Sequence, residues 1–565
     1  MDYKKHIAEK LASCGIDKEE IEAAIAVPPD NKMGDYALPC FKFAKVMRKS
    51  PVAIAEELKN TFATDDAISE VEAVNGYLNF RVNRTALVKE TLEKIAEQGE
   101  AFGSSDMGNG KTICIDYSSV NIAKPFHIGH LSTTVIGGAL YRIFKFLGYN
   151  TVGINHLGDY GTQFGKLIYA YKHGGLEEAV KEGGVKELTR LYVRYHKESE
   201  NDPSMDDEAR SYFKLIENGD EECVKLFNLF KEITLKEVEK IYDELDIKFD
   251  SYAGESFYND KMQPVIDELA EKGLLVESEG AKIVDLEKYG MPPCIILRSD
   301  GASLYATRDL AAACYRKEHY DFDKCLYVVA YQQNLHFKQI FKVLELMGKP
   351  WAKDLVHVAY GMVSLLDDNG NQVAMSTRNG TVVLLEDVLK KCHEKCLEII
   401  EQKNPDLEDK ENVARQVGTG AVIFGALSNS KIKDIAFSYS KILNFDGETG
   451  PYVQYTAARI KSVLRKGGAI GKYEIKNVNE DEYQLIALLS TFPDVVKAAA
   501  ERLEPFFVTR YAIDVASAFN KFYFDCKIIG DDANETNFRL AISSATLTVL
   551  SSALTLLGIK VPERM

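Results

Sequence analysis

The chain has 565 residues, a net charge of −16 and 27% charged residues. Its length is more than one hydrophobic core normally organises, so three or four domains are expected, and a hydrophobic content of 46% excludes a disordered chain. The first residues, MDYKKHIAEK, carry charges where a secretory signal needs an apolar run, so we expect a protein without such a signal.

Residues 1–105 predict a small α+β domain. A helical pattern begins at Ser50-Pro51 and runs to Leu58, and residues 76–80 (Gly-Tyr-Leu-Asn-Phe) are typical of a short strand. The loop 103–110 is rich in glycine and serine and marks the end of this domain.

Residues 106–410 predict a parallel, Rossmann-type α/β sheet. Strand patterns at 111–116 and 151–156 flank a helical pattern at 130–147, which is a βαβ unit. The alternation stops over about 176–297, where a charged helical stretch and then β-structure indicate an insertion. A second α/β half follows, with strands at 325–330 and 355–363 and a helix from His336.

Residues 411–565 show long helical patterns and no strand alternation, so we expect a separate all-helical domain. Its segment 540–559 is uncharged and roughly long enough to cross a bilayer. It contains seven hydroxyl side chains, however, and leucines at helical spacing (Leu547, Leu550, Leu554, Leu557). This pattern favours a buried terminal helix and a soluble protein.

The ten cysteines are scattered, which favours a reducing compartment and a cytoplasmic protein. Only Cys392-His393-x-x-Cys396 resembles part of a metal site. A zinc site needs about four ligands, and no second pair follows at the spacing of a zinc finger. We interpret these residues as packing residues and expect no structural metal.

The acidic total hides two basic stretches. Residues 415–466 hold eight basic side chains against three acidic ones, and the segment 28–49 is also basic. Such runs are most often solvated faces, but contact with nucleic-acid phosphates needs only a local stripe, so RNA is not excluded. Aromatic and basic residues at 452–465 and 520–523 are equally consistent with base stacking and with a helical core.

The most informative peptide is the turn between the first strand and the first helix of the sheet, residues 116–130. Open α/β sheets bind ligands at this crevice, and a helix N-terminus there offers free N–H groups to phosphates. His127 and His130 can both face such a site, and Gly129 allows a nucleotide to approach the backbone.

The string His127-Ile128-Gly129-His130 resembles the HIGH motif of class I aminoacyl-tRNA synthetases. The residues around it, and five further motifs, narrow the resemblance to arginyl-tRNA synthetases from about residue 28 to the end of the chain. The five are residues 155–165 (NHLGDYGTQFG), 305–310 (YATRDL), 333–337 (QNLHF), 375–380 (MSTRNG) and 450–455 (GPYVQY).

This resemblance implies the roles of the site residues. Tyr305 and Asp309, four residues apart on a helix, are implied to bind the guanidinium of arginine, which needs carboxylates as partners. The rest of the amino acid is implied to lie among Asp116, Ser119, Asn121, His130 and Gln333. ATP is implied to contact His127, Gly129, His130, Met375 and Ser376. The catalytic set is His127, His130, Lys124, Met375, Ser376, Thr377 and Arg378.

Three positions depart from the family pattern. Val120 stands where proline is common, and Gln332 stands where an acidic residue is common. Ala374 replaces the lysine that opens the usual KMSK loop, and similar family members carry a lysine shortly before HIGH. In this chain that lysine is Lys124.

The resemblance implies a three-part enzyme: an N-terminal tRNA-binding domain, a class I catalytic domain and a DALR-type anticodon-binding domain. It would activate L-arginine with ATP, with Mg²⁺ carried on the nucleotide, and transfer the arginyl group to the 3′ end of tRNA(Arg). We expect no membrane partner and a monomer. Two alternatives stay open: a catalytically inactive relative that binds tRNA as a regulator, motivated by Ala374, and an enzyme that adenylates another substrate without RNA.

Overall fold

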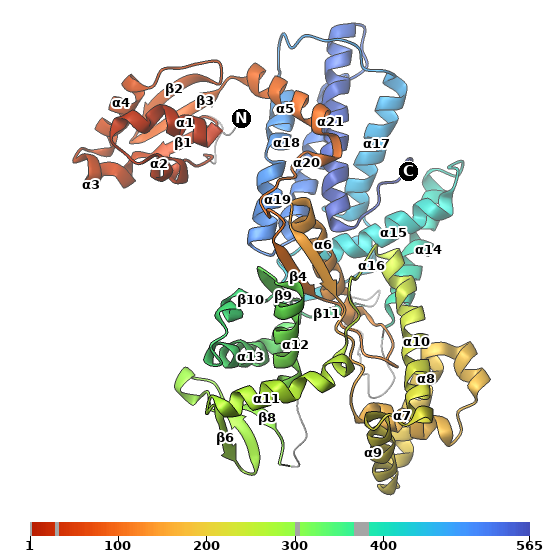
Figure 1. The fold of residues 1–565 in the computed structure, drawn as a ribbon. Coiled ribbons are helices and arrows are strands. Elements are labelled where there is room, and N and C mark those ends of the chain that lie inside the picture. The colour runs from red at the N-terminus through yellow and green to blue at the C-terminus, as the bar shows by residue number, and fades with distance from the viewer. Residues whose placement is uncertain (1–2, 29–32, 300–304, 367–382) are drawn as a thin grey trace. The chain divides into compact units, whose positions relative to one another are not determined.

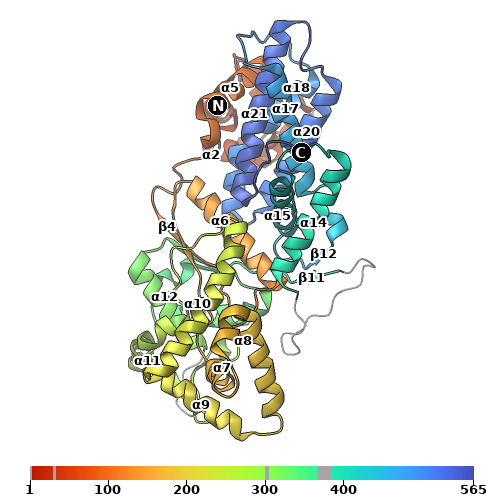
Figure 2. The same ribbon diagram turned by 90° about the vertical axis from the view of Figure 1, so that its right-hand side faces the viewer.

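The computed structural model describes residues 3–28, 33–299, 305–366 and 383–565 (Figures 1 and 2). The chain divides into two compact units. The first comprises residues 1–102, 462–492 and 517–549, and the second comprises 103–461, 493–516 and 550–565.

The first unit contains the predicted N-terminal α+β fold. Its antiparallel sheet has the order β1-β3-β2, formed by β1 (Tyr36–Pro39), β2 (Ile68–Val74) and β3 (Tyr77–Val82). Helices α1 (Tyr3–Leu11), α2 (Lys18–Ala24), α3 (Ala44–Met47), α4 (Pro51–Thr61) and α5 (Arg84–Gln98) accompany the sheet. Ser50 caps α4 by accepting from the Ala53 N–H, and Pro51 fills the first turn, as the sequence predicts.

Segments from the far end of the chain complete this unit. Helix α18 (Glu480–Ser490) begins with a capping box between Asn479 and Glu482, and it packs against α5. The buried Glu482 carboxylate also accepts from the Arg539 Nε at 2.9 Å. Of the aromatic residues considered for base stacking, Phe522 is fully buried and Tyr523 is 43% exposed.

The second unit is built on the predicted parallel sheet. Its order is β10-β9-β4-β5, formed by β4 (Thr112–Asp116), β5 (Asn150–Ile154), β9 (Lys324–Tyr327) and β10 (Leu355–His357). Cys114 on β4 lies opposite Val152 on β5 and Cys325 on β9. All three pairings are parallel, so the carboxyl ends of these strands meet at one edge. Helix α6 (Leu131–Phe146) connects β4 to β5, and α13 (Asn334–Leu346) connects β9 to β10.

The insertion is mostly helical, as predicted. Helices α7 (Thr162–Lys172), α8 (Glu177–Ser199), α9 (Ser204–Glu217) and α10 (Glu221–Glu244) lie together in both views (Figures 1 and 2). A small antiparallel sheet of β6 (Leu275–Ser278), β7 (Ala281–Val284) and β8 (Cys294–Leu297) follows α11 (Met262–Glu271). Helix α12 (Tyr305–Tyr320) then leads back to β9.

The described chain after residue 383 is mostly helical. Besides α18, its helices are α14 (Leu385–Lys403), α15 (Lys410–Leu427), α16 (Tyr439–Ile442), α17 (Gly450–Gly467), α19 (Phe492–Glu501), α20 (Phe506–Asp525) and α21 (Ala533–Leu557). One feature was not predicted. The short strand β12 (Ile435–Phe437) pairs in parallel with β11 (Val363–Leu365), and three residues are too few to show an alternating pattern in the sequence. Cys392 and Cys396 are buried on α14, and the described residues hold no cluster of three metal-binding side chains.

Helix α21 contains the uncharged segment singled out in the sequence. Among the described residues it is the one helix long and apolar enough to cross a membrane. Of its most apolar stretch, 67% is buried in the protein, which agrees with the predicted core helix.

Candidate active site

The turn between β4 and α6 has an unusual backbone that buried hydrogen bonds support. Ser118, Ser119 and Ala123 adopt left-handed conformations with φ of 68°, 49° and 59°, which non-glycine residues rarely do. The Ser118 N–H donates to Thr133 Oγ1 at 3.0 Å, and the Ser118 hydroxyl lies 2.7 Å from the Tyr242 hydroxyl. The surrounding structure therefore holds this turn in a conformation that its sequence alone would not favour.

The HIGH turn, residues 127–130, presents two neutral imidazoles. The His127 N–H donates to Nδ1 of His130 at 3.2 Å, and the Gly129 N–H donates to Nδ1 of His127 at 3.1 Å. Burial lowers the pKa of His127, and the charge of Lys124 lowers it further. Burial and the neighbouring His127 lower the pKa of His130 to about 3. Since each Nδ1 accepts, each neutral ring carries its proton on Nε2, where it can be donated.

The chain that follows the predicted signature loop is bonded directly to the HIGH turn. The Ile128 N–H donates to the Val383 carbonyl at 2.9 Å, and the Leu385 N–H donates to the Phe126 carbonyl at 3.1 Å. Ala374 and the predicted residues Met375, Ser376, Thr377 and Arg378 lie outside the described residues. The described chain resumes at Val383, which is bonded to the HIGH turn.

Asp116, at the carboxyl end of β4, is buried, and each of its carboxylate oxygens has one partner. One carboxylate oxygen accepts from the Ser119 hydroxyl at 2.9 Å, and the other lies 2.7 Å from Nη2 of Arg316. Asn121 lies on the next turn, where the backbone of this loop pairs with that of Gly158. A Cβ on Gly158 would lie 2.3 Å from Oδ1 of Asn121, so a glycine is required there. The structure thus brings Asp116 and Ser119 together, with Asn121 on the same loop.

Asp309 lies one helical turn after Tyr305 on α12, as predicted. Its carboxylate accepts from Nε2 of His336 at 2.6 Å, and Nε2 of His156 lies 4.0 Å away. Burial acts to raise the pKa of Asp309, but the hydrogen bond and charge of His336 outweigh burial and hold that pKa below its usual range. Tyr305 is 67% exposed. Gln333 is also exposed and immediately precedes α13, the helix that carries His336.

The sequence analysis missed Glu255, which lies on the 3₁₀ segment Glu255–Lys261 after the insertion. Its carboxylate is 3.8 Å from Nη1 of Arg308, the residue before Asp309. Burial raises the pKa of Glu255 to about 7; Arg308 and Lys124 act against this rise, and the charges of Asp309 and Asp159 add to it. No pattern of spacing links Glu255 to Asp309 in the sequence, so folding alone reveals the pair.

Lys124 is half-buried just before the HIGH turn. Burial lowers the pKa of its ammonium group, against the opposite effect of Glu255. Lys124 also lines a cavity of about 320 Å³ together with Phe126, Lys186 and residues of α8, α10 and α14. Its charge acts on both His127 and His130, so it belongs electrostatically to the HIGH turn.

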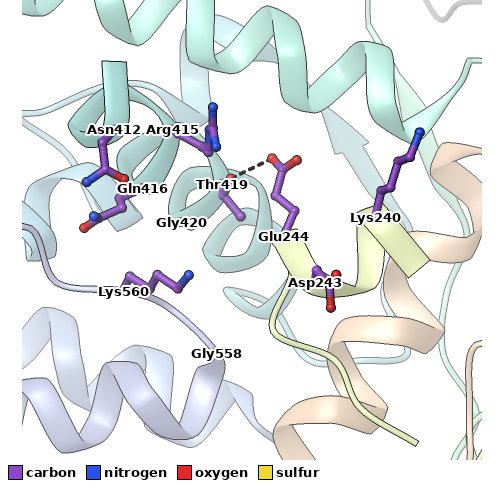
Figure 3. A pocket seen from close by; sticks show the side chains of 10 residues that line it. All are labelled: Lys240, Asp243, Glu244, Asn412, Arg415, Gln416, Thr419, Gly420, Gly558 and Lys560. Atoms are coloured by element: carbon purple, nitrogen blue, oxygen red, sulfur yellow. Dashed lines mark hydrogen bonds between the residues drawn. The ribbon is translucent and has the colours of Figure 1, made fainter. Parts of the chain in front are cut away.

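A second cavity of about 320 Å³ contains no predicted site residue. It is lined by α10, α15 and the chain after α21 (Figure 3). In this cavity the Glu244 carboxylate accepts from the Thr419 hydroxyl at 3.0 Å, and it also lies 3.0 Å from Nε2 of His393. Volume alone therefore does not identify the active site.

Comparison with known proteins places this site in a family. The model described as tRNA synthetases class I (R), catalytic domain, matches residues 91–439. The arginyl tRNA synthetase N terminal domain model matches residues 1–82, and the DALR anticodon binding domain model matches 453–565. The chain belongs to the arginyl-tRNA synthetase family.

Relatives and solved structures agree over the full length. The chain is 52% identical to the arginine–tRNA ligase of Clostridium beijerinckii over 571 residues, which covers 100% of both chains. The Thermus thermophilus arginyl-tRNA synthetase has a TM-score of 0.83 at 27% identity, covering 100% of this chain and 99% of its own. The Plasmodium falciparum enzyme has a TM-score of 0.80 at 25% identity, with coverages of 99% and 98%. The predicted family and fold class are thus confirmed. The alternative without RNA does not explain the anticodon-binding match.

Alanine at Gly129 tests the HIGH geometry. A Cβ there would lie 2.8 Å from Cε1 and 2.9 Å from Nδ1 of His127, so the ring must move and lose its bond to the Gly129 N–H. We expect Gly129→Ala to lower kcat of ATP–pyrophosphate exchange by about 10-fold or more, as for a displaced transition-state donor. Ser132→Ala is the control, because the buried Ser132 hydroxyl has no hydrogen-bond partner among the described residues. Equal activity of the two variants would contradict the assigned geometry.

Proposed function

We propose that this chain activates L-arginine with ATP and transfers the arginyl group to the 3′ end of tRNA(Arg), with the residue roles given below. The arginine carboxylate attacks the α-phosphorus of ATP and pyrophosphate leaves; the ribose hydroxyl of the tRNA then takes the arginyl group and AMP leaves. The observation that carries the proposal is a pair of carboxylates, Asp309 and Glu255, in a class I site. Burial raises the pKa of Glu255, Arg308 acts against this rise, and the charge of Asp309 adds to it. A bound cation would stabilise both carboxylates in their charged form.

That cation is the guanidinium of arginine. A guanidinium has five donors in a planar fork and is best held by two carboxylates with a hydroxyl nearby. Asp309, oriented by His336, and Glu255, beside Arg308, supply the carboxylates. Tyr305, one turn before Asp309 and largely exposed, supplies the hydroxyl.

The backbone end of arginine lies among residues of the β4 edge. Asp116, Ser119 and Asn121 come from the strained turn, and Gln333 precedes α13. The Asp116 carboxylate already accepts from Ser119 and pairs with Arg316, and its remaining lone pairs can accept from an ammonium group. His130 completes this set.

The phosphates of ATP lie against the HIGH turn. His127 and His130 donate from Nε2 to the phosphate oxygens, and Gly129 lets the nucleotide approach the backbone. We also assign catalytic roles to Met375, Ser376, Thr377 and Arg378, which lie outside the described residues. Mg²⁺ neutralises the phosphates and is carried mainly by the nucleotide, so we assign it no protein ligand.

The three parts of the chain divide the work on tRNA. We assign tRNA contacts to residues 1–105, catalysis to 106–410 with the insertion at about 176–297, and anticodon recognition to 411–565. The charge of the basic stretch 415–466 supports phosphate contacts in the last part. The enzyme acts in the cytoplasm as a monomer.

Asp309→Asn tests the guanidinium site. The substitution removes the counter-charge of a desolvated cation, which should cost several kcal/mol of binding free energy. KM for arginine should therefore rise on the order of 100-fold or more, while KM for ATP stays nearly constant. Asp323→Asn is a matched control, since Asp323 pairs with Lys111 at the surface. A near-normal KM for arginine in Asp309→Asn would disprove the assignment.

The raised pKa of Glu255 predicts a pH dependence of arginine use. Below about pH 7 the free enzyme holds Glu255 protonated, and arginine binding must expel that proton. Hence kcat/KM for arginine should fall as pH drops through the pKa of Glu255, and this limb should disappear in Glu255→Gln. An identical limb in both enzymes would assign the titration to another group.

Lys124 is proposed to supply the cation that Ala374 cannot. Lys124→Ala should lower kcat for adenylation by roughly 100-fold, the loss typical of one transition-state donor, and Ala374→Lys should partly restore that mutant. Lys186→Ala is the control, because Lys186 lines the same cavity. Ordinary exchange activity of Lys124→Ala would leave Arg378 as the next candidate cation. An exchange-active wild-type enzyme also rules out the inactive regulatory relative.

A further inference from the structure

Asp159, in the motif at residues 155–165, is not among the proposed substrate ligands, and its buried carboxylate accepts from three donors. Its carboxylate accepts from Nζ of Lys231 at 2.7 Å, from the Ser256 N–H at 2.8 Å and from the Ser256 hydroxyl at 2.8 Å. Only 1% of Asp159 is exposed. A carboxylate in this setting is costly unless its donors stay in place, so it fixes their positions strongly.

Two of those donors belong to Ser256, the residue next to Glu255. On the other side, a Cβ at Gly254 would lie 2.6 Å from Oδ1 of Asp159, so the backbone packs directly against this carboxylate. The Glu255 N–H itself donates to the Leu157 carbonyl at 2.9 Å. Ser256 and the Glu255 N–H are thus hydrogen-bonded to the segment 157–159, and Gly254 packs against it, so the backbone that carries the Glu255 carboxylate is held in place.

The third donor comes from the insertion. Lys231 lies on α10, and one turn later Thr234 Oγ1 accepts from the N–H of Ala123, one of the left-handed residues before the HIGH turn. Without the Lys231 ammonium, Asp159 would be a buried charge supported only by Ser256. It would then have to take up water or a proton, or shift toward another donor, and Ser256 would shift with it.

We propose that Asp159 and Lys231 are positioning residues for arginine recognition, which act through Ser256 to hold the Glu255 carboxylate in place beside Arg308, the neighbour of Asp309. This inference rests on the proposed role of Glu255 as a guanidinium ligand. In this proposal, helix α10 of the insertion affects the affinity for arginine although none of its residues binds arginine directly.

A double-mutant cycle separates this role from a general structural one. The full-length enzyme carries Lys231→Met, Glu255→Gln or both, and ATP–pyrophosphate exchange with tRNA gives KM for arginine and for ATP. Lys231→Met should raise KM for arginine by roughly 10-fold or more, the scale of a broken buried ion pair, and leave KM for ATP within about 2-fold. In the Glu255→Gln background the same substitution should add almost nothing.

Two further variants serve as a control and as a replacement in this cycle. Lys240→Met makes the same change on the same helix, at a lysine without an ion-pair partner among the described residues, and should leave both constants unchanged. If Lys231→Met does not fold, as judged by thermal unfolding, Ser256→Ala replaces it, because it removes one hydrogen bond and keeps the Ser256 N–H in place.

The outcomes are distinct. If Lys231→Met and Glu255→Gln raise KM for arginine independently, so that their effects multiply in the double mutant, the positioning role is overturned. The same holds if Lys231→Met raises KM for ATP equally. Both outcomes leave the proposed function intact. An ordinary KM for arginine in Glu255→Gln would instead overturn the assignment of Glu255 itself, and the inference with it.

Discussion

A buried carboxylate must have donors, and this requirement organises the whole site. Asp116 is matched by Arg316, Asp159 by Lys231 and Asp309 by His336, and in each case the partner comes from a different segment of the fold. Each pair therefore ties two segments together that are distant in the sequence. Glu255 differs, since its partner Arg308 is 3.8 Å away and its pKa is raised. Of these four described carboxylates, Glu255 is therefore the one to which we assign the substrate cation.

The second constraint is backbone strain. Three left-handed residues in one turn cost free energy, of order 1–3 kcal/mol each, and they persist only because neighbours hold them. Most of that support comes from α10 and α6: Thr234 and Tyr242 on α10 bond to the turn, and so does Thr133 on α6. An inserted segment thus became part of the catalytic framework rather than an appendage to it. The same elements thus support the chain that leads into the HIGH turn.

The sequence predicted what depends on local pattern. The four strands of the parallel sheet follow from runs of apolar residues, and the helix after His130 follows from its periodicity. The motif YATRD placed Tyr305 and Asp309 on one helix, because a spacing of four residues is one turn. Local sequence patterns do not predict contacts between segments that are distant in the sequence. Neither Arg316 beside Asp116 nor Glu255 beside Arg308 has a signal in its own neighbourhood, and β12 is too short to show a period.

The same distinction explains why recognition of arginine needs more than its contact residues. A guanidinium is held well only when two carboxylates keep a fixed separation, and a shift of about 1 Å can cost 100-fold in rate. Asp309 gains this rigidity from a long helix and from His336. Glu255 sits on a short 3₁₀ segment, and its carboxylate has only the more distant Arg308, at 3.8 Å, as an ion-pair partner among the described residues. Its precision must be supplied from outside, and the buried carboxylate of Asp159, held by a lysine of the insertion, is the group placed to supply it.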